Sequence, residues 1–176
     1  MKRGFVIEPL RGHDRSNFSC GAAPLDRYLR EQASQDVKRL LASCFLLTET
    51  ATKTLAGYYT LAATSIPASD LSPDILKRLP RYPVLPAALI GRLAVDRRFH
   101  RQGLGSVLLA DAALRVIAGD TKAFALVVEA KDDNAVAFYE RQGFAPFASR
   151  PASLFLPLAT VKKGAGMETP RRGGKG

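Results

Sequence analysis

Residues 89–109 read LIGRLAVDRRFHRQGLGSVLL, and this stretch decides the fold. The apolar run over 89–95 predicts a central strand of a sheet. A charged loop with Gly103 and Gly105 follows, and an amphipathic helix is expected over 105–118. Apolar residues recur along this helix at spacings of three and four, and the face expected to pack on the sheet is made of Val107, Ala110, Leu114 and Ile117.

A strand, a glycine loop and a helix in this order favour an anion site. The first turn of a helix has unpaired N–H groups, and the helix dipole places positive charge at the same end. The cations Arg97, Arg98 and Arg101 beside the glycines favour an anion further, although they also suit a solvated loop. The stretch therefore predicts a phosphate site, with a plain turn that binds no ligand as the alternative.

Two common phosphate motifs do not fit this loop. The dinucleotide-binding fingerprint needs a third glycine, and this chain has Leu108 at that position. The Walker loop needs Gly-Lys-Ser or Gly-Lys-Thr, which does not follow here. The predicted phosphate thus belongs to another class of ligand.

The remaining chain alternates short strands and helices. Strands are expected over 5–7, 44–47, 55–61, 124–130 and 154–156, and helices over 24–38, 70–79 and 134–142, the last ended by Gly143. The prolines within 80–86 cannot continue a helix and favour an extended chain. This order predicts a mixed α/β fold with a central sheet flanked by helices.

Composition indicates one domain. Of the 176 residues, 47% are hydrophobic, which is enough for a single core. We expect a domain over 1–160 and a basic, flexible tail over 161–176.

No apolar run is long enough to span a bilayer and no secretion signal follows Met1, so a cytoplasmic protein is expected. Cys20 and Cys44 lack the spacing of metal ligands, so no metal is expected.

The net charge of +10 favours polyanionic partners. Residues 162–176 carry +4 of this charge, in Lys162, Lys163, Arg171, Arg172 and Lys175 against Glu168. The rest of the chain therefore keeps a charge of +6 and stays basic without the tail.

Two separated motifs resemble those of the GCN5-related N-acetyltransferase (GNAT) family. The first is Val95-Asp96 with Gln102-Gly103-Leu104-Gly105 and Leu108-Leu109, and the second is Asn134 with Ala137-Phe138-Tyr139 and Gly143-Phe144. The resemblance implies the GNAT fold, with a mixed and mostly antiparallel sheet, and acetyl-CoA as co-substrate. It implies a cofactor site made of Leu93, Ala94, Val95, His100, Arg101, Gln102, Gly103, Leu104, Gly105, Ser106, Asn134, Phe138 and Tyr139.

The resemblance also assigns parts of acetyl-CoA to parts of the chain. It implies that backbone groups over 93–95 hold the pantetheine arm and that N–H groups over 101–106 hold the pyrophosphate. The family usually has Gln or Arg where this chain has His100, so the role of that side chain stays open. Asn134 either caps its helix or, by resemblance, contacts the cofactor arm.

Tyr139 is the expected catalytic residue. Attack by an amine on a thioester expels a thiolate, and a phenol near the sulfur can protonate it as a general acid. The alternative is an aromatic residue that only packs between a helix and the sheet.

Further motifs resemble the acetyltransferase toxins of bacterial toxin–antitoxin pairs, over roughly residues 5–160. They are Phe18-Ser19-Cys20-Gly21, Leu25-Asp26, Tyr28-Leu29, Gly57-Tyr58-Tyr59-Thr60-Leu61, Tyr82-Pro83, Pro86, Gly91-Arg92-Leu93-Ala94-Val95-Asp96 and Leu154-Phe155-Leu156-Pro157. The resemblance implies acetylation of the α-amino group of aminoacyl-tRNA, which blocks translation. It also implies a homodimer and a ribbon-helix-helix antitoxin through which DNA is bound. The alternatives are an acetyltransferase for a protein or small-molecule amine, and a nucleic-acid-binding protein with an inactive acetyltransferase fold.

Charge and chemistry agree with a tRNA substrate. The cations expected to contact tRNA phosphates are Lys77, Arg78, Arg81, Arg92, Arg97 and Arg98. An α-amine with a pKa near 7.8 is neutral in about one molecule in seven at pH 7, against about one in 2,500 for a lysine amine near 10.4. An α-amine therefore needs less help from a base, and neither Glu129 nor His13 is marked out as one. The aminoacyl pocket is expected near Tyr58, Tyr59 and the segment 80–86.

Overall fold

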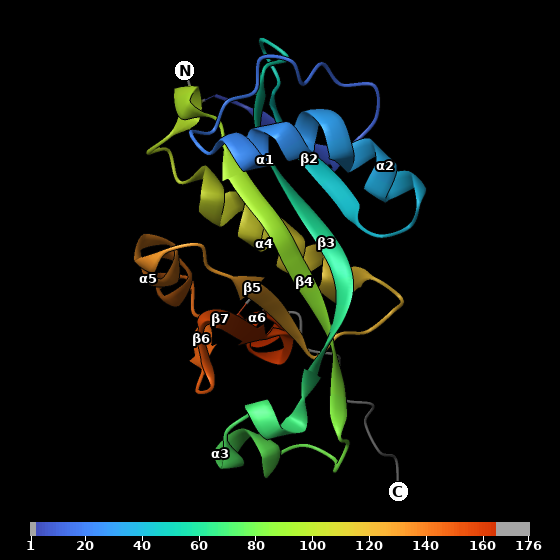
Figure 1. Ribbon diagram of the computed structural model, residues 1–176, viewed down its shortest axis with the longest axis vertical. Coiled ribbons are helices and arrows are strands. Elements are labelled where there is room, and N and C mark those ends of the chain that lie inside the picture. Colours follow the sequence, from blue (N-terminus) through green and yellow to red (C-terminus); the bar gives the residue numbers. More distant parts are fainter. Residues whose placement is uncertain (1–2, 165–176) are drawn as a thin grey trace, which may run out of the picture.

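The protein folds around one seven-stranded sheet with the strand order β1-β2-β3-β4-β5-β7-β6 (Figure 1), in a computed structural model that describes residues 3–164. The strands are β1 Phe5–Pro9, β2 Ser43–Glu49, β3 Leu55–Pro67, β4 Val84–Val95, β5 Ala125–Glu129, β6 Ala145–Phe147 and β7 Arg150–Pro157. Neighbouring strands are antiparallel except β4 and β5, which are parallel. The predicted mixed, mostly antiparallel sheet is confirmed.

Helices cover both faces of the sheet (Figure 1). The helices are α1 Ala23–Arg27, the π-helical turn η1 Tyr28–Gln32, α2 Ala33–Lys38, α3 Pro73–Leu76, α4 Leu104–Ala118, α5 Asp133–Arg141 and α6 Leu158–Gly164, with 3-10 turns η2 Ala68–Asp70 and η3 Arg97–Phe99. Helices α1 and α2 lie in front of β2 and β3 in Figure 1, and α4 lies behind β3 and β4. The long β3–β4 pair extends beyond the other strands and ends beside α3.

Alternation along the strands divides the core between these two layers. Tyr58 and Ala94 belong to the cluster that Phe18 and Leu29 form beneath α1 and α2. The next residue, Tyr59, belongs instead to the cluster beneath α4. The adjacent tyrosines are thus buried on opposite faces of the sheet.

The structure contradicts the predicted buried face of α4. Val107 and Leu114 are 45% and 42% exposed, and Ala110 is exposed as well. The residues buried against the sheet are Leu104, Leu108, Leu109, Ala112 and Ala113. Apolar residues occur on most sides of this helix, so spacings of three and four fit two different faces. The helix buries the face with more leucine, because larger side chains remove more apolar surface from water.

Other elements also differ from the prediction. The helix expected over 70–79 is only the short α3, preceded by η2, and neither β6 nor α6 was expected. In α6, Leu158 is buried and Val161 packs on the core, so residues 161–164 of the expected tail belong to a helix. The other tail residues, 165–176, lie outside the described part. Among residues 3–164, no helix is long and apolar enough to cross a membrane.

Candidate active site

Strand β4 has two halves with different partners. Over 87–90 it pairs with β5 on one side and β3 on the other, and its pairing with β5 ends at Ile90. The register with β3 then shifts between Tyr59 and Leu61, which leaves Gly91 and Arg92 opposite a single residue, Thr60. This is a β-bulge, which bends a strand. The Arg92 N–H donates to the Thr60 hydroxyl oxygen at 3.1 Å. Beyond this bulge, β4 has no β5 partner.

The half of β4 beyond the bulge presents unpaired backbone groups. Facing pairs in an antiparallel ladder alternate between hydrogen-bonded and non-hydrogen-bonded. The Asp96 N–H donates to the Ala56 carbonyl at 2.8 Å, which fixes this alternation. Ala94 is therefore bonded to β3, whereas the N–H and C=O groups of Leu93 and Val95 point to the side that β5 has left. Of the three residues predicted to contact the ligand through their backbone, Leu93 has its N–H and C=O free of β3 and Val95 its N–H, while the Val95 C=O accepts from His100 Nε2 at 2.7 Å.

The loop after β4 forms a backbone nest at the start of α4. Arg101 and Gly103 both have left-handed backbone angles, with φ of 62° and 73°. Left-handed residues within such a turn direct successive N–H groups to one side and create an anion-binding concavity. Helical bonding begins when the Val107 N–H donates to the Gly103 carbonyl, so the N–H groups of residues 104–106 precede it. The predicted phosphate loop therefore has the geometry of an anion site.

A buried carboxylate anchors this loop to the N-terminal segment. Asp96 is 1% exposed and accepts hydrogen bonds from the Ser19 N–H at 3.0 Å and the Arg98 N–H at 2.9 Å. The Arg98 guanidinium donates two more, at 2.9 and 3.0 Å. Burial works to raise the pKa of this carboxyl, but the hydrogen bonds from Arg98 and Ser19 outweigh it and hold the pKa below its usual value.

A cavity of about 680 Å³ opens where β4 and β5 separate. Its walls come from the start of α1, the bulge of β4, the end of β5 and the first turns of α5. The lining residues are Ala22, Pro24, Leu25, Ile90, Gly91, Arg92, Leu93, Glu129, Lys131, Asp132, Asn134, Ala135, Phe138 and Tyr139.

Tyr139 has the features of a proton donor in this cavity. Its ring is buried, and no described residue hydrogen-bonds its hydroxyl, whereas the hydroxyls of Tyr28, Tyr58 and Tyr59 all donate to protein oxygens. Burial raises the pKa of Tyr139 to about 12, so the phenol stays protonated at neutral pH. The cavity thus holds an uncommitted O–H group.

Helix α5 connects Tyr139 to the phosphate loop. A Cβ added to Gly105 would lie 3.2 Å from the ring of Phe138, so a side chain there would require that ring to shift by a few tenths of an ångström. Phe138 in turn contacts Tyr139 edge-on, with ring centroids 5.2 Å apart. The proposed cap at Asn134 is wrong, because the Asp132 carboxylate caps α5 by accepting from the Ala135 N–H at 2.8 Å. Asn134 lines the cavity instead.

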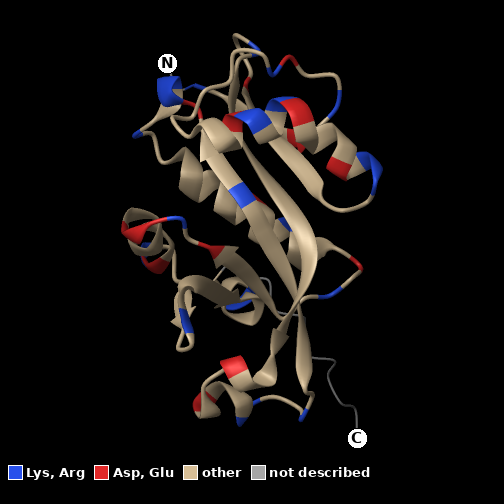
Figure 2. Ribbon diagram, in the orientation of Figure 1, with Lys and Arg blue, Asp and Glu red and all other residues tan. Residues whose placement is uncertain are grey.

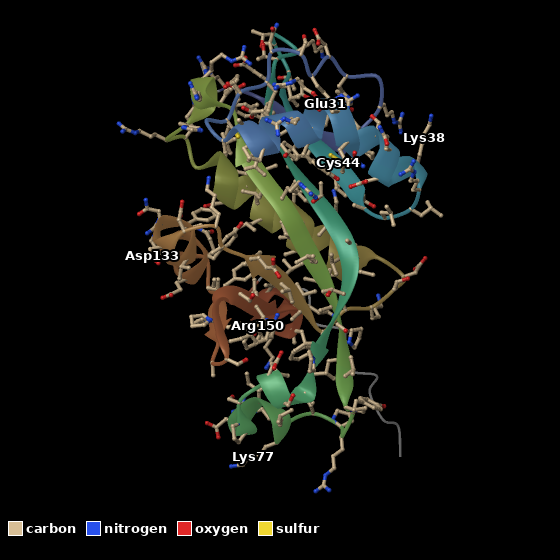
Figure 3. The ribbon with its side chains drawn as sticks, in the orientation of Figure 1. Glu31, Lys38, Cys44, Lys77, Asp133 and Arg150 are labelled. Carbon is tan, nitrogen blue, oxygen red and sulfur yellow. The ribbon has the colours of Figure 1, made fainter. Side chains whose placement is uncertain are left out.

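The structure brings only part of the predicted site together. Leu93, Asn134, Phe138 and Tyr139 line one cavity, and the loop over 100–106 lies beside it through Gly105. The predicted tRNA contacts divide into two groups, since Figure 2 shows cations on the η3 turn at one end and near α3 at the other. Arg92, Arg97 and Arg98 belong to the cavity end, and Lys77, Arg78 and Arg81 to the far end, where Figure 3 labels Lys77.

Two predicted features are corrected. The guanidinium of Arg98 is held by Asp96, so this side chain is not an uncommitted cation. The aminoacyl pocket does not lie at Tyr58 and Tyr59, because both rings are 0% exposed and their hydroxyls bond Leu25 and Asp111. The segment 80–86 also lies away from the cavity, beside α3 (Figure 1).

Sequence reasoning missed several cavity residues. Lys131 and Glu129 flank the end of β5, and Pro24 and Leu25 come from a helix far away in sequence. A second cavity of about 350 Å³ shares Pro24, Leu25 and Arg92 with the first. The Arg92 guanidinium lies 3.5 Å from the centre of the Tyr28 ring, between the two cavities. Only the toxin-like motif around 18–29 hinted that this helix contributes.

Metal chemistry has no visible support in the described residues. No group of three or more His, Cys, Asp or Glu side chains among residues 3–164 is placed to hold a metal ion.

The chain is similar to known acetyltransferases. Residues 86–153 match the family described as acetyltransferase (GNAT) domain. A probable toxin TacT from Sinorhizobium fredii is 32% identical over 168 residues, which cover 89% of this chain and 93% of the relative. A tRNA-acetylating toxin from Mycobacterium tuberculosis is 36% identical over 151 residues, with 85% and 89% covered.

Solved structures agree with these relatives. The toxin AtaT in complex with acetyl-methionyl-tRNA superposes with a TM-score of 0.83 at 27% identity, over 92% of this chain and 99% of AtaT. The overall fold of this chain is thus similar to that of AtaT. The chain belongs to the GCN5-related N-acetyltransferase family, within its group of toxins, and is an acetyl-CoA-dependent N-acetyltransferase.

Proposed function

We propose that the protein is the toxin of a type II toxin–antitoxin pair, which transfers the acetyl group of acetyl-CoA to the α-amino group of aminoacyl-tRNA and thereby blocks translation. The observation that carries this proposal is the cavity beside the unpaired half of β4, which is lined by Tyr139, whose hydroxyl has no partner among the described residues. The similarity to a tRNA-acetylating toxin over most of the chain supports the choice of acceptor.

The cofactor assignment follows from the unpaired backbone groups. Leu93 offers its N–H and C=O groups and Val95 its N–H group to the amides of the pantetheine arm, and the nest over 101–106 offers N–H groups to the pyrophosphate. Asn134 and Phe138 line the space between these two parts. When bound, acetyl-CoA supplies a thioester whose carbonyl carbon an amine can attack.

Tyr139 serves as the general acid. The phenol is protonated at neutral pH, and burial, which raises its pKa to about 12, keeps it so. It therefore still holds its proton when a thiolate leaving group forms beside it. The proton of Tyr139 therefore goes to the sulfur as the C–S bond breaks.

The acceptor amine needs little help from the protein. Glu129 and Asp132 are the carboxylates that line the cavity in the described part of the chain, and both residues are exposed. An amine with a pKa near 7.8 is already neutral in about one molecule in seven at pH 7. An α-amine is thus the class of amine that this cavity suits best.

The cations around the cavity support a tRNA acceptor. Arg92 and Lys131 line the cavity, and Arg97 stands on the adjacent loop with no ion-pair partner among the described residues. These residues can position phosphates near the acetyl group. The more distant Lys77, Arg78 and Arg81 would contact another part of the same large substrate.

The direct test incubates the purified protein with acetyl-CoA and a set of charged tRNAs. Mass spectrometry of the released amino acids is expected to find N-acetyl-aminoacyl groups, and Tyr139→Phe is expected to lower their yield. If no charged tRNA is acetylated while lysine peptides or small amines are, the alternative of a protein or small-molecule acetyltransferase replaces this proposal.

We infer four further properties that rest on the same proposal. A ribbon-helix-helix antitoxin neutralises the toxin, since a related toxin, AtaT, is bound to the C-terminus of its antitoxin AtaR. DNA is bound only through that antitoxin, and the toxin itself forms a homodimer. Its substrates place it in the bacterial cytoplasm. Light scattering on the isolated protein tests the dimer, and tight operator binding without the antitoxin would contradict the second point.

A further inference from the structure

His100 makes one contact that its position in the loop does not require. Its Nε2 lies 2.7 Å from the carbonyl oxygen of Val95, five residues earlier in the chain. A carbonyl oxygen only accepts hydrogen bonds, so Nε2 carries the proton in this contact. Both the neutral imidazole with its proton on Nε2 and the doubly protonated ring can donate in this way.

The Val95 carbonyl is a group that needs such a partner. Its residue belongs to the unpaired half of β4, whose backbone points away from β3. Without a donor, this oxygen would present negative partial charge beside the nest over 101–106, where an anion is to bind. The N–H donated by His100 offsets that charge. The same hydrogen bond links residue 100 back to residue 95 and so closes the turn between β4 and the nest.

Other side chains in the same turn hold it from different directions. Asp96 is bonded to Ser19 and Arg98, and the Phe99 ring is buried and contacts Phe5 edge-on at 5.9 Å. These contacts fix the first part of the turn. They do not reach His100, the residue before Arg101. Arg101 itself has a left-handed φ of 62°. His100 is the residue that ties this last part to β4.

We propose that His100 is a positioning residue for the pyrophosphate part of acetyl-CoA. By donating to the Val95 carbonyl, it holds Arg101 and the N–H groups after it in the anion-binding arrangement and offsets the negative partial charge of an acceptor oxygen. The inference rests on the assignment of the pyrophosphate to this loop, and does not depend on which amine is acetylated.

Two variants separate the hydrogen bond from the size of the side chain. His100→Gln places an amide N–H at nearly the same reach, whereas His100→Met has a similar length and no donor. Their affinities are measured for CoA, which contains the pyrophosphate, and for pantetheine, which lacks it. Calorimetry serves for CoA, and ligand-observed NMR serves for the weaker pantetheine.

We expect a large loss of affinity only for CoA and only in His100→Met. His100→Met is expected to weaken CoA binding about tenfold, the effect of roughly one hydrogen bond, and to leave pantetheine binding within about twofold. His100→Gln is expected to bind CoA within about threefold of the original protein. Equal losses for both ligands, or no loss for CoA in His100→Met, would overturn the proposal. Because no acceptor is present, these outcomes are independent of the charged-tRNA assay.

Discussion

The two halves of β4 have similar apolar sequences, but one half pairs with strands on both sides and the other with β3 alone. In the half over 87–90, strands on both sides bond the backbone, and Ala87 and Ile90 are buried. Beyond the bulge at Gly91 and Arg92, one side of the backbone has no strand beside it. Unpaired backbone groups are unfavourable in a core. Here Leu93 lines a cavity, so one half is a structural strand and the other is the strand to which we assign the pantetheine arm.

The comparison teaches that the site arises from an interruption of the sheet. Once β5 leaves β4, the gap admits α5 from one side and the start of α1 from the other, and both line the cavity. We call the half of β4 beyond the bulge the open half. Three substitutions and the addition of CoA test how far it depends on the residues that border it.

The largest effect is a loss of kcat, which is expected when the phenol hydroxyl of Tyr139 is removed. Tyr139→Phe is expected to lower kcat about 10²–10³-fold, the range typical for the loss of a general acid. Because the hydroxyl has no partner among the described residues, the melting temperature should stay nearly unchanged. The matched control is Tyr59→Phe, which removes a hydrogen bond to Asp111 beneath α4. It is expected to destabilise the fold by about 1–2 kcal/mol while kcat remains. Equal kcat losses in both variants would contradict the role of Tyr139.

The next effect is expected at the anchor where the open half ends. Asp96→Asn removes the charge to which Ser19 and Arg98 donate, and is expected to lower the free energy of unfolding by about 2–3 kcal/mol at pH 7. Chemical denaturation measures this loss. Asp70→Asn is the control, since Asp70 pairs with the half-exposed Arg150 away from the cavity. Its loss is expected to stay below about 1 kcal/mol.

The loss of stability caused by Asp96→Asn is expected to depend on pH. The folded protein holds the pKa of Asp96 below its usual value. Such a group stabilises the fold fully above its unfolded pKa of about 3.9, and this contribution is lost as the pH falls through the lower folded pKa. The stability difference between the original protein and Asp96→Asn should therefore be constant from pH 5 to 7, on the order of the value above, and shrink below about pH 4. A difference that grows in acid would contradict the charged state assigned to Asp96.

Local patterns predicted the parts of this site that lie within one stretch of sequence. The strand, the glycine loop and the helix follow each other directly, and Phe138 and Tyr139 lie on one short helix. The features that the sequence missed depend on partners far away along the chain. Asp96 meets Ser19 across 77 positions, so no local pattern contains the burial of this carboxylate.

Strand pairing explains the remaining errors. The bulge requires the register between β3 and β4, which no local pattern contains. Tyr58 and Tyr59 looked like pocket residues because they are polar aromatics in a motif, but alternation buries one beneath each helical layer. The buried face of α4 was ambiguous because its apolar residues fit two stripes.

A smaller effect is expected at the bulge itself. Thr60→Val keeps the shape of a buried side chain and removes the oxygen that accepts from the Arg92 N–H. The unsatisfied N–H is expected to lower the free energy of unfolding by about 1–2 kcal/mol. Because the bulge sets the direction of the open half, KM for acetyl-CoA should also rise a few-fold. Thr64→Val, on the same strand beyond the cavity, is the control and should change stability by less than about 0.5 kcal/mol. A rise in KM of the same size in Thr64→Val would show that the bulge is not the cause.

The smallest effect needs no mutation and addresses the open half directly. In the protein without ligand, the N–H of Ala94 is protected by its ladder bond to β3, whereas those of Leu93 and Val95 point to the side that β5 has left and should exchange faster with solvent. Saturating CoA should slow exchange at Leu93 and Val95 by about tenfold, since each hydrogen bond to the pantetheine arm contributes on the order of 1 kcal/mol. Exchange at Ala94 and at Ala88 in the paired half should change little. Residue-resolved exchange measured by NMR gives all four rates in one experiment. Protection that appears at Ala94 and Ala88 as strongly as at Leu93 and Val95 would mean that CoA stiffens the whole strand, and the separation of β4 into a structural half and a binding half would not hold.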